Sequence, residues 1–385
     1  MYLLMNKNDI IASYELRNGE FGSYLELFGC DENRLPYGCE NINHWLKNRK
    51  AINHNEHIRK LICDMGCDDN INFIRLTHAG SLNDTFWMKS EEESINWEDV
   101  SYYRNEFSEV VSRLAFEGQG LSGEDISGTK PELSTDGSFP KCWKRENGEI
   151  FLIKSGSETC AEPYCEALAA EVAAKITNAV HYDISEFAGR PVTKCRLFTD
   201  EKTGYVSASK VKVPREINEL MNWMSERGFE DSFRRMLLAD CLTFNPDRHA
   251  GNYGFLMEND TLRITGLAPA FDYNLAMLPY AENADQLPRE LGETWPKIGD
   301  DFVRFGQMLL TDQLRRELNE LRDYEFTFRG DGHFPESRVK LTEELLDRQL
   351  TAILSREVLF TRDVYMHEKD IEDYTARREV NGKRL

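Results

Sequence analysis

Apolar residues in the second half of the chain recur every three or four positions, with polar residues between them. This spacing predicts amphipathic helices that pack against a core. Asn245 and Pro246 end one of them, because proline cannot continue the hydrogen-bond ladder of a helix. We therefore expect a helical domain over residues 215–385, with helices at 216–229, 234–244, 300–323 and 339–360.

The pattern between residues 118 and 214 is different, because short apolar runs alternate there with turn residues. Residues 140–145 and 149–154 are predicted strands, joined by the hairpin signal Asn147-Gly148. A helix is predicted over 162–178, with Pro163 in its first turn, where proline is tolerated. This pattern predicts a strand-rich domain, with further strands at 190–198 and 205–211.

Residues 1–117 carry no motif of known chemistry. Their apolar runs predict two strands around a turn near Gly19, an interrupted helix over 44–66 and a helix over 105–116. We interpret this part as an additional N-terminal α/β domain that packs against the rest. The three parts together predict an α+β fold.

Size and charge limit the possible partners. A chain of 385 residues with 41% apolar residues suits two or three folded domains. Its formal net charge of −20 opposes attraction to nucleic acid or anionic membranes. No apolar run approaches the roughly 20 residues of a membrane span, and Asn6, Lys7 and Asp9 interrupt the N-terminal apolar residues of any signal peptide. We expect a cytoplasmic protein with no membrane and no direct nucleic-acid partner.

The nine cysteines are odd in number and scattered, which indicates reduced thiols rather than a disulfide framework. Four residues have the side chains of a zinc site, namely His54, His57, Cys63 and Cys67. Apolar residues at helical spacing lie among them, namely Ile58, Leu61, Ile62 and Met65. A half-buried helix explains this pattern as well as zinc does, and we favour the helix.

Candidate chemistry follows the predicted helix over 234–244. Phosphoryl transfer needs a group that orients the attacking hydroxyl and accepts its proton, and it needs oxygen ligands for Mg²⁺. Asp247 or His249 supplies the first, and Asn252 and Asp272 supply the second. Two short strands at 253–257 and 261–265 form a predicted hairpin, which returns the chain so that Asp272 approaches the earlier loop.

A second candidate set precedes this loop and has the features of an ATP site. Residues 121–139 are rich in Gly, Ser and Thr, which let backbone N–H groups approach phosphate oxygens, although the Walker A pattern is absent. We assign ATP-phosphate contacts there to Ser134, Thr135 and Gly137.

Lys154 ends the next strand, where its ammonium meets the α and β phosphates of ATP. Glu166 or Glu171 on the following helix is its predicted partner. From the order of elements alone, Ser207, Ala208 and Lys210 are candidates for a hinge that binds adenine.

The sequence DRHAGN at 247–252, followed by AFD at 270–272, resembles the HipA-like (HipA/CtkA-type) serine/threonine kinases. It is also similar to the DRHxxN loop of phosphatidylinositol kinases, and it departs from the HRDxxxxN and DFG motifs of ordinary protein kinases, with Tyr273 in place of the DFG phenylalanine. The resemblance implies a two-lobed protein-kinase-like fold, with a β-rich N-lobe over 118–214 and a helical C-lobe over 215–385. It favours Glu166 over Glu171, because Glu166 matches an EPYxE pattern.

The resemblance also implies an activity and partners. We expect ATP- and Mg²⁺-dependent transfer to a protein serine or threonine, and a small DNA-binding antitoxin as a binding partner. It implies autophosphorylation of the phosphate loop as well, whose hydroxyl residues are Ser127, Thr129, Ser134, Thr135 and Ser138. A kinase of lipids or small molecules and a nucleotide-binding regulator without transfer activity stay as alternatives.

The roles of two residues stay open. His249 is a second acid/base group or orients the loop, and Arg248 clamps a carboxylate or reaches a phosphate.

Overall fold

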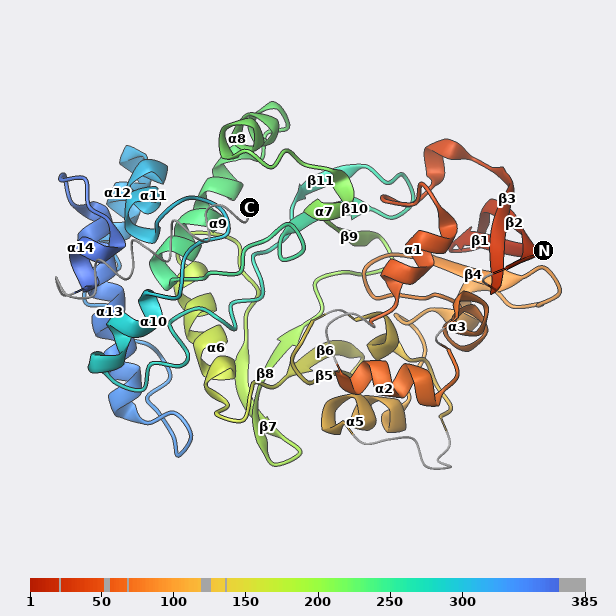
Figure 1. Cartoon of the computed structure of the whole chain (residues 1–385), viewed down its shortest axis with the longest axis horizontal. Helices are drawn as coiled ribbons and strands as arrows, with labels where there is room; N and C mark the ends of the chain where they lie inside the picture. The colour runs from red at the N-terminus through yellow and green to blue at the C-terminus, as the bar shows by residue number, and fades with distance from the viewer. Residues whose placement is uncertain (21, 52–55, 68, 119–125, 136, 367–385) are drawn as a thin grey trace.

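The computed structural model describes the chain except for residues 21, 52–55, 68, 119–125, 136 and 367–385. Helices mix with antiparallel sheets in this structure, as the sequence predicted. In Figure 1 the N-terminal sheet lies at one end of the molecule and the helices of the C-terminal part lie at the other. The predicted domain boundaries at residues 117 and 214 stay predictions.

The N-terminal part contains a sheet with the strand order β3-β2-β1-β4. The sequence predicted two strands here before the helices, and the structure has three. The additional turn lies at Lys7, which adopts a left-handed φ of +49° and so lets β1 pair back onto β2. The strands are β1 (Tyr2–Asn6), β2 (Asp9–Gly19), β3 (Gly22–Cys30) and β4 (Phe86–Ser90), and the helices are α1 (Ile42–Arg49), α2 (Glu56–Asp64), α3 (Asn70–Thr77), α4 (Trp97–Val100) and α5 (Glu109–Glu117).

The second sheet has the order β5-β6-β8-β7 and is antiparallel throughout. The predicted Asn147-Gly148 turn joins its first two strands, and both residues have positive φ, as a tight hairpin requires. One strand was not predicted, because its residues are largely exposed and show no apolar alternation. The elements are β5 (Lys141–Glu146), β6 (Glu149–Lys154), α6 (Ala161–Ala173), β7 (Asp183–Phe187) and β8 (Arg190–Arg196).

The third sheet has the order β11-β10-β9. Its first strand was predicted to run from 205 to 211, but it ends at Ser207 and a short helix follows. Ser207 pairs with Gly254, so β9 belongs to the sheet of the 254–267 hairpin and not to the sheet that carries Lys154. The elements are β9 (Thr203–Ser207), α7 (Ala208–Val211), β10 (Gly254–Glu258) and β11 (Ile264–Leu267).

The C-terminal part is helical, as predicted. One predicted helix, over 300–323, is two helices, because Thr311 caps the second with its hydroxyl and so separates it from the first. The helices are α8 (Ile217–Glu226), α9 (Glu230–Thr243), α10 (Leu287–Leu291), α11 (Phe302–Leu309), α12 (Asp312–Asn319), α13 (Glu336–Leu354) and α14 (Thr361–Tyr365). Short 3-10 helices cover η1 (Glu32–Arg34), η2 (Pro131–Ser134) and η3 (Ala284–Gln286).

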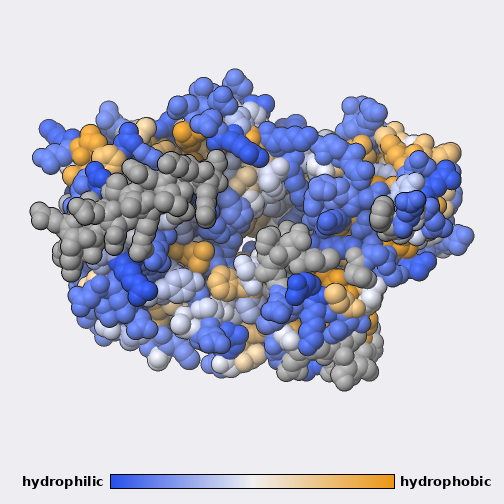
Figure 2. Space-filling view, viewed as in Figure 1, coloured by the Kyte–Doolittle hydropathy of each residue, from blue (hydrophilic) through white to orange (hydrophobic). Residues whose placement is uncertain are grey.

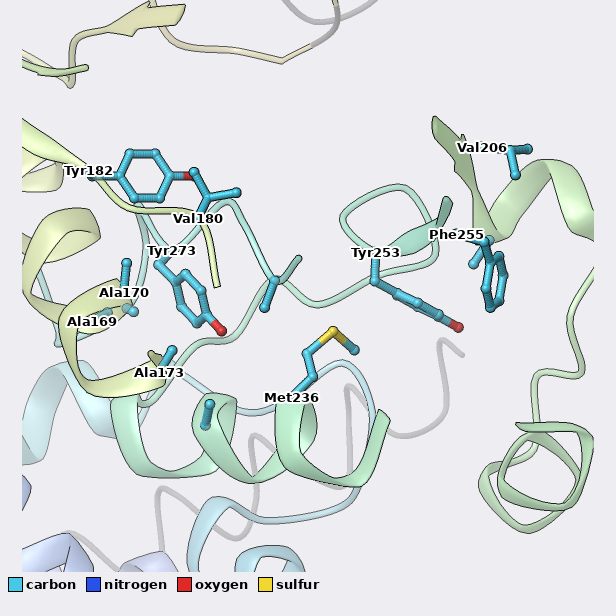
Figure 3. Close-up of a cluster of buried hydrophobic side chains, with 14 of the residues drawn as sticks. Ala169, Ala170, Ala173, Val180, Tyr182, Val206, Met236, Tyr253, Phe255 and Tyr273 are labelled. Carbon is cyan, nitrogen blue, oxygen red and sulfur yellow. The ribbon is translucent and has the colours of Figure 1, made fainter. Parts of the chain in front are cut away.

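The main core joins α6, α9 and the hairpin that follows α9. Figure 3 shows the ring of Tyr273 beside the small side chains of α6, which let the chain after β11 approach that helix closely. Tyr273 is fully buried. The core therefore fixes the distance between α6 and the residues around Asp272.

The N-terminal part packs on both neighbouring sheets. Leu82 and Tyr102 join Trp143 and Ile150 of the β5–β6 hairpin in one apolar cluster. On the other side, the Tyr205 N–H donates to the Asn83 carbonyl at 2.6 Å. Most of the face seen in Figure 2 is hydrophilic, with an apolar patch at the end that carries the N-terminal sheet, where Ile10, Tyr24, Leu27 and Phe28 are exposed.

Of the candidate zinc residues, His57 and Cys63 belong to α2 and Cys67 follows it. His54 falls outside the described residues, and Ile58, Leu61 and Ile62 are buried on one face of α2, as the half-buried helix predicts. Within the described ranges, no three His, Cys, Asp or Glu side chains gather as a metal site. None of the helices in those ranges has both the length and the apolar character that a bilayer crossing needs.

Candidate active site

The structure brings Lys154, Glu166 and Asp272 together from β6, α6 and the chain after β11. The Lys154 Nζ lies 2.9 Å from Glu166 Oε1 and forms an ion pair with Asp272. Thr193 of the neighbouring strand donates to the other oxygen of Glu166 at 2.8 Å. Glu171 lies elsewhere, because it accepts hydrogen bonds from the 324–327 segment. The geometry pairs Lys154 with Glu166 and not with Glu171.

Electrostatics keep this cluster charged. Burial lowers the pKa of Lys154, but the carboxylates of Asp272 and Glu166 outweigh burial and raise it well above its usual range. Burial raises the pKa of Asp272, but the charges of Lys154 and Lys141 outweigh it and lower the pKa to about 2. One ammonium thus faces two carboxylates, and the side chain of Asp272 keeps 26% of its surface exposed.

Arg248 holds the loop that follows α9. Its Nε and Nη2 donate to the two oxygens of Asp240, each at 2.9 Å, and the residue is buried. Its Nη1 donates to the carbonyls of Asn252 and Phe271, both at 2.5 Å. Arg248 therefore clamps a carboxylate, and one nitrogen ties the end of the loop to the residue before Asp272.

Asp247 and Asn252 contact each other across that loop. The Asn252 Nδ2 donates to the backbone oxygen of Asp247 at 3.0 Å and to its Oδ2 at 3.3 Å. Burial raises the pKa of Asp247, His249 opposes the shift, and the charge of Asp272 adds to it. The charge of Asp272 thus acts on the carboxylate of Asp247.

His249 lies 3.9 Å from Asp247, measured from Nε2 to Oδ2. Its Nδ1 accepts the Gly251 N–H at 3.0 Å, so the ring contributes to the shape of the loop. Its side chain is half exposed. This contact fits a histidine that orients the loop.

The donor set of this site fits Mg²⁺. A small, hard cation prefers oxygen ligands, with one or two carboxylates supplemented by phosphate oxygens and water. Asn252 directs its amide nitrogen at Asp247, which leaves its amide oxygen for a cation. Asp272 adds an ionised carboxylate. Fewer than three acidic ligands suffice when the nucleotide supplies the others.

The predicted phosphate loop is described in part, since residues 121–125 and 136 lie outside the described residues. The hydroxyls of Ser134 and Thr135 both donate to the Pro131 carbonyl, at 3.2 and 2.7 Å, and the Trp143 Nε1 donates to Thr135 Oγ1 at 2.8 Å. These hydroxyls shape η2. Gly137 has a φ of +117°, and a Cβ there would lie 1.9 Å from the Nζ of Lys141.

Lys141 is a site residue that the sequence analysis missed. It is the first residue of β5 and pairs directly with Lys154, so both side chains leave the same face of the sheet. Both residues are 7% exposed, and the charge of Lys141 lowers the pKa of Asp272. A signal exists in the sequence, because Lys141 and Lys154 are equidistant from the Asn147-Gly148 turn.

The predicted hinge residues lie beside the 247–252 loop. The Ala208 N–H donates to the Tyr253 carbonyl at 3.0 Å, and the next amide, that of Ser209, donates to Ala250 at 2.9 Å. Ser207 lies in the β9–β10 ladder, and Lys210 is exposed beside Gly38 of the N-terminal part.

The chain leaves the sheet of Lys154 earlier than predicted, at the end of β8, and crosses to β9 over residues 197–202. Phe198 in this crossing packs against Phe271, with ring centroids 6.0 Å apart, and Phe271 directly precedes Asp272. Tyr205 contacts both rings. An aromatic cluster therefore borders the candidate site at the crossing.

Comparisons with known proteins were made for sequence and for structure. No family model matches the chain, and no curated protein matches it. Among solved structures, HipA of Shewanella oneidensis MR-1, from a toxin–antitoxin complex with HipB and operator DNA, matches with a TM-score of 0.50 and 15% identity, covering 91% of this chain and 97% of that chain. The proinflammatory kinase CtkA of Helicobacter pylori matches with a TM-score of 0.43 and 17% identity, covering 60% of this chain and 94% of that chain. The similarity to HipA shows a HipA-like fold.

Proposed function

We propose that this protein is an ATP- and Mg²⁺-dependent serine/threonine protein kinase with two lobes. The observation that carries the proposal is the convergence of Lys154, Glu166 and Asp272, which lie more than 100 residues apart in sequence at their extremes, beside a loop that presents Asp247 and Asn252. A buried ammonium between two carboxylates has the components that a nucleotide triphosphate site uses. The sheet of β5 to β8 forms the N-lobe in this proposal, and the helical part forms the C-lobe.

Each residue has a role that its position supports. Lys154, held by Glu166, contacts the α and β phosphates, and Lys141 on the same sheet face adds a second positive charge. Asp272 and Asn252 hold Mg²⁺, which when bound neutralises charge on the phosphates. Asp247 orients the acceptor hydroxyl and takes its proton, since its carboxylate is partly exposed and hydrogen-bonded to Asn252. Arg248 keeps the loop and the residue before Asp272 in place.

In this proposal Ser207, Ala208 and Lys210 form the hinge, because this segment follows β9 and is hydrogen-bonded to residues 250–253. The Ala208 N–H donates to Tyr253, so other backbone groups of the segment would contact the base. The rings of Phe198 and Phe271 provide an apolar surface for adenine next to Asp272.

The acceptor and the partner are proposed at the level of class. The acceptor is a protein serine or threonine. Self-phosphorylation is proposed for the phosphate loop, whose hydroxyl residues are Ser127, Thr129, Ser134, Thr135 and Ser138. Because the HipA structure contains HipB and operator DNA, we propose a DNA-binding antitoxin as a partner, which would contact DNA in place of this acidic chain.

The test is a cell extract incubated with γ-labelled ATP and either the wild-type protein or Asp272→Ala, followed by phosphopeptide mass spectrometry. Asp183→Ala, an exposed aspartate on β7, is the matched control. New phosphoserine or phosphothreonine peptides are expected with the wild type and the control and not with Asp272→Ala. Label in lipids or metabolites alone would select a kinase of small molecules. Equal labelling by wild type and Asp272→Ala would refute the proposed site.

A further inference from the structure

The segment five to nine residues after Asp272 has an unusual backbone. Met277 and Leu278 are consecutive non-glycine residues with φ of +55° and +51°, in the left-handed region that L-residues seldom occupy. Both are fully buried. The Met277 N–H donates to the Thr243 carbonyl at 2.7 Å, and Arg338 Nη2 of α13 donates to the carbonyls of Met277 and Leu278, at 3.3 and 2.5 Å. A strained conformation of this kind persists only where neighbouring groups hold it.

Tyr280 in the same segment connects two acidic side chains. Its N–H donates to Glu290 Oε1 of α10 at 3.2 Å, and its hydroxyl donates to Glu162 Oε1 of α6 at 3.1 Å. Glu162 is fully buried, whereas Tyr280 is 53% exposed. The second oxygen of Glu162 has no hydrogen-bond partner among the described residues. Among the described residues, the tyrosine hydroxyl therefore makes the one side-chain hydrogen bond to this buried carboxylate.

The position of Glu162 relates this contact to the active site. Glu162 precedes Glu166 by four residues on α6, so both side chains lie on the same side of the helix. Its Oε2 also lies against the connection between β6 and α6, where a Cβ at Gly156 would come within 2.4 Å. The Tyr280–Glu162 hydrogen bond thus joins the chain that carries Asp272 to the helix that carries Glu166.

We propose that Tyr280 and Glu162 are positioning residues for the kinase site: their hydrogen bond sets α6 against the segment after Asp272, and so sets Glu166 and Asp272 around Lys154. This inference rests on the proposed function. The competing explanation is local, in which Glu162 only stabilises the N-terminus of α6.

The chain offers a matched control on the same helix. The Tyr324 hydroxyl donates to Glu171 Oε1 at 2.7 Å, so a second tyrosine bonds to a second glutamate of α6. Glu171 also accepts from Thr327 and does not take part in the Lys154 cluster. Tyr280→Phe and Tyr324→Phe each remove a tyrosine hydroxyl that donates to a glutamate of α6, and they differ in whether that glutamate lies near the Lys154 cluster.

The experiment uses the full chain and two measurements. The first is hydrogen–deuterium exchange without nucleotide, followed in peptides from α6 and from residues 273–281. Tyr280→Phe should speed exchange in both, and Tyr324→Phe should leave residues 273–281 unchanged. The second is the initial rate of label transfer from γ-labelled ATP to extract protein. Tyr280→Phe should lower the apparent kcat about tenfold, as for loss of a hydrogen bond to a charged group, and Tyr324→Phe should leave it unchanged.

Two variants of Glu162 complete the test. Glu162→Gln keeps an acceptor oxygen for the tyrosine and should keep the wild-type kcat, whereas Glu162→Met should lose about tenfold. The double variant Tyr280→Phe/Glu162→Met should also lose about tenfold, and a loss of about a hundredfold would show that the two residues act independently. Independent losses, or unchanged exchange over 273–281 in Tyr280→Phe, would overturn the proposal. If the wild type transfers no label, the proposed function has failed, and the exchange measurement alone decides whether Tyr280 couples the segment to α6.

Discussion

Arg248 and Lys154 are both buried cations that face carboxylates, but their surroundings differ. Arg248 donates to both oxygens of Asp240 and to two backbone carbonyls, and the side chain of Asp240 is 5% exposed. Lys154 contacts Glu166, which is buried, and Asp272, whose side chain is 26% exposed. The Arg248 guanidinium donates to protein acceptors on all three of its nitrogens. Lys154, in contrast, has one partner, Asp272, that is partly open to solvent.

The difference separates a structural ion pair from a binding one. A buried charge with complete hydrogen bonding stabilises one geometry, and removing it leaves its partner charged and unpaired. A buried ammonium with a partly exposed carboxylate partner can form an ion pair with a nucleotide phosphate instead. The carboxylate is then available to bind a metal ion. We therefore propose that Arg248 maintains the conformation of the loop and that Lys154 contacts the ligand of the site. Four predictions test this comparison.

Arg248→Met should have the largest effect, because it leaves Asp240 buried without a counter-ion. We expect the free energy of unfolding to fall by about 3–5 kcal/mol, measured by urea denaturation. Arg104→Met is the control, since Arg104 is 45% exposed beside Glu201 and should change stability little. A loss for Arg248→Met as small as that of the control would show that this pair does not hold the loop.

Lys154→Met should weaken nucleotide binding by about 10- to 100-fold, equivalent to about 1.4–2.8 kcal/mol, because the phosphates lose their nearest buried cation. The measurement is the shift of Tm on adding ATP and Mg²⁺, which binding to the folded state raises. Lys144→Met is the control, because Lys144 belongs to the same hairpin but packs over the ring of Phe187. An equal nucleotide shift in the wild type and Lys154→Met would remove Lys154 from the binding site.

Acid should weaken the protein through Asp272. Its pKa is lowered from 3.8 to about 2 in the folded state, so its contribution is complete above pH 4 and is lost as pH falls towards 2. The shift corresponds to about 2 kcal/mol. Urea denaturation of the wild type and Asp272→Asn between pH 2 and 5 should show a steeper pH dependence for the wild type. Parallel curves would mean that Lys154 does not hold Asp272 in its ionised form.

The smallest expected effect is on the pH dependence of transfer. Burial raises the pKa of Asp247, and a general base must be ionised, so the rate should fall up to tenfold per unit as pH drops below this raised pKa. His249→Asn should keep this acid limb if Asp247 is the base. Loss of the limb in His249→Asn would assign proton transfer to the histidine instead.

Local sequence signals predicted the elements well where a strong signal exists. The Asn147-Gly148 turn fixed the β5–β6 hairpin, and Pro246 fixed the end of α9. Predictions failed where the signal is weak or depends on distant residues. The turn at Lys7 needs a left-handed backbone in a residue that rarely adopts it, and β7 is too polar to show alternation.

The candidate site was predicted in part. The sequence indicated Lys154, Asn252 and Asp272 by residue type and order, and the family resemblance favoured Glu166 over Glu171 as the partner of Lys154, which is the pairing in the structure. It missed Lys141, and the hinge at 207–210 stays a prediction, in a segment whose Ala208 and Ser209 amides are bonded to the 250–253 region. The point at which the chain passes from the sheet of Lys154 to the sheet of β9 depends on how the strands pair. Single residues do not encode this pairing.

The sequence by itself determined which residues are candidates for chemistry and which local structures present them, because side-chain type, turn residues and apolar spacing act over a few positions. Only the tertiary structure decided that Lys154 pairs with Glu166 and Asp272, that Arg248 clamps Asp240, and that Tyr280 reaches Glu162. These contacts join residues up to 118 positions apart. Their geometry follows from how α6, α9 and the β10–β11 hairpin pack into one core, and close packing allows few arrangements of those elements.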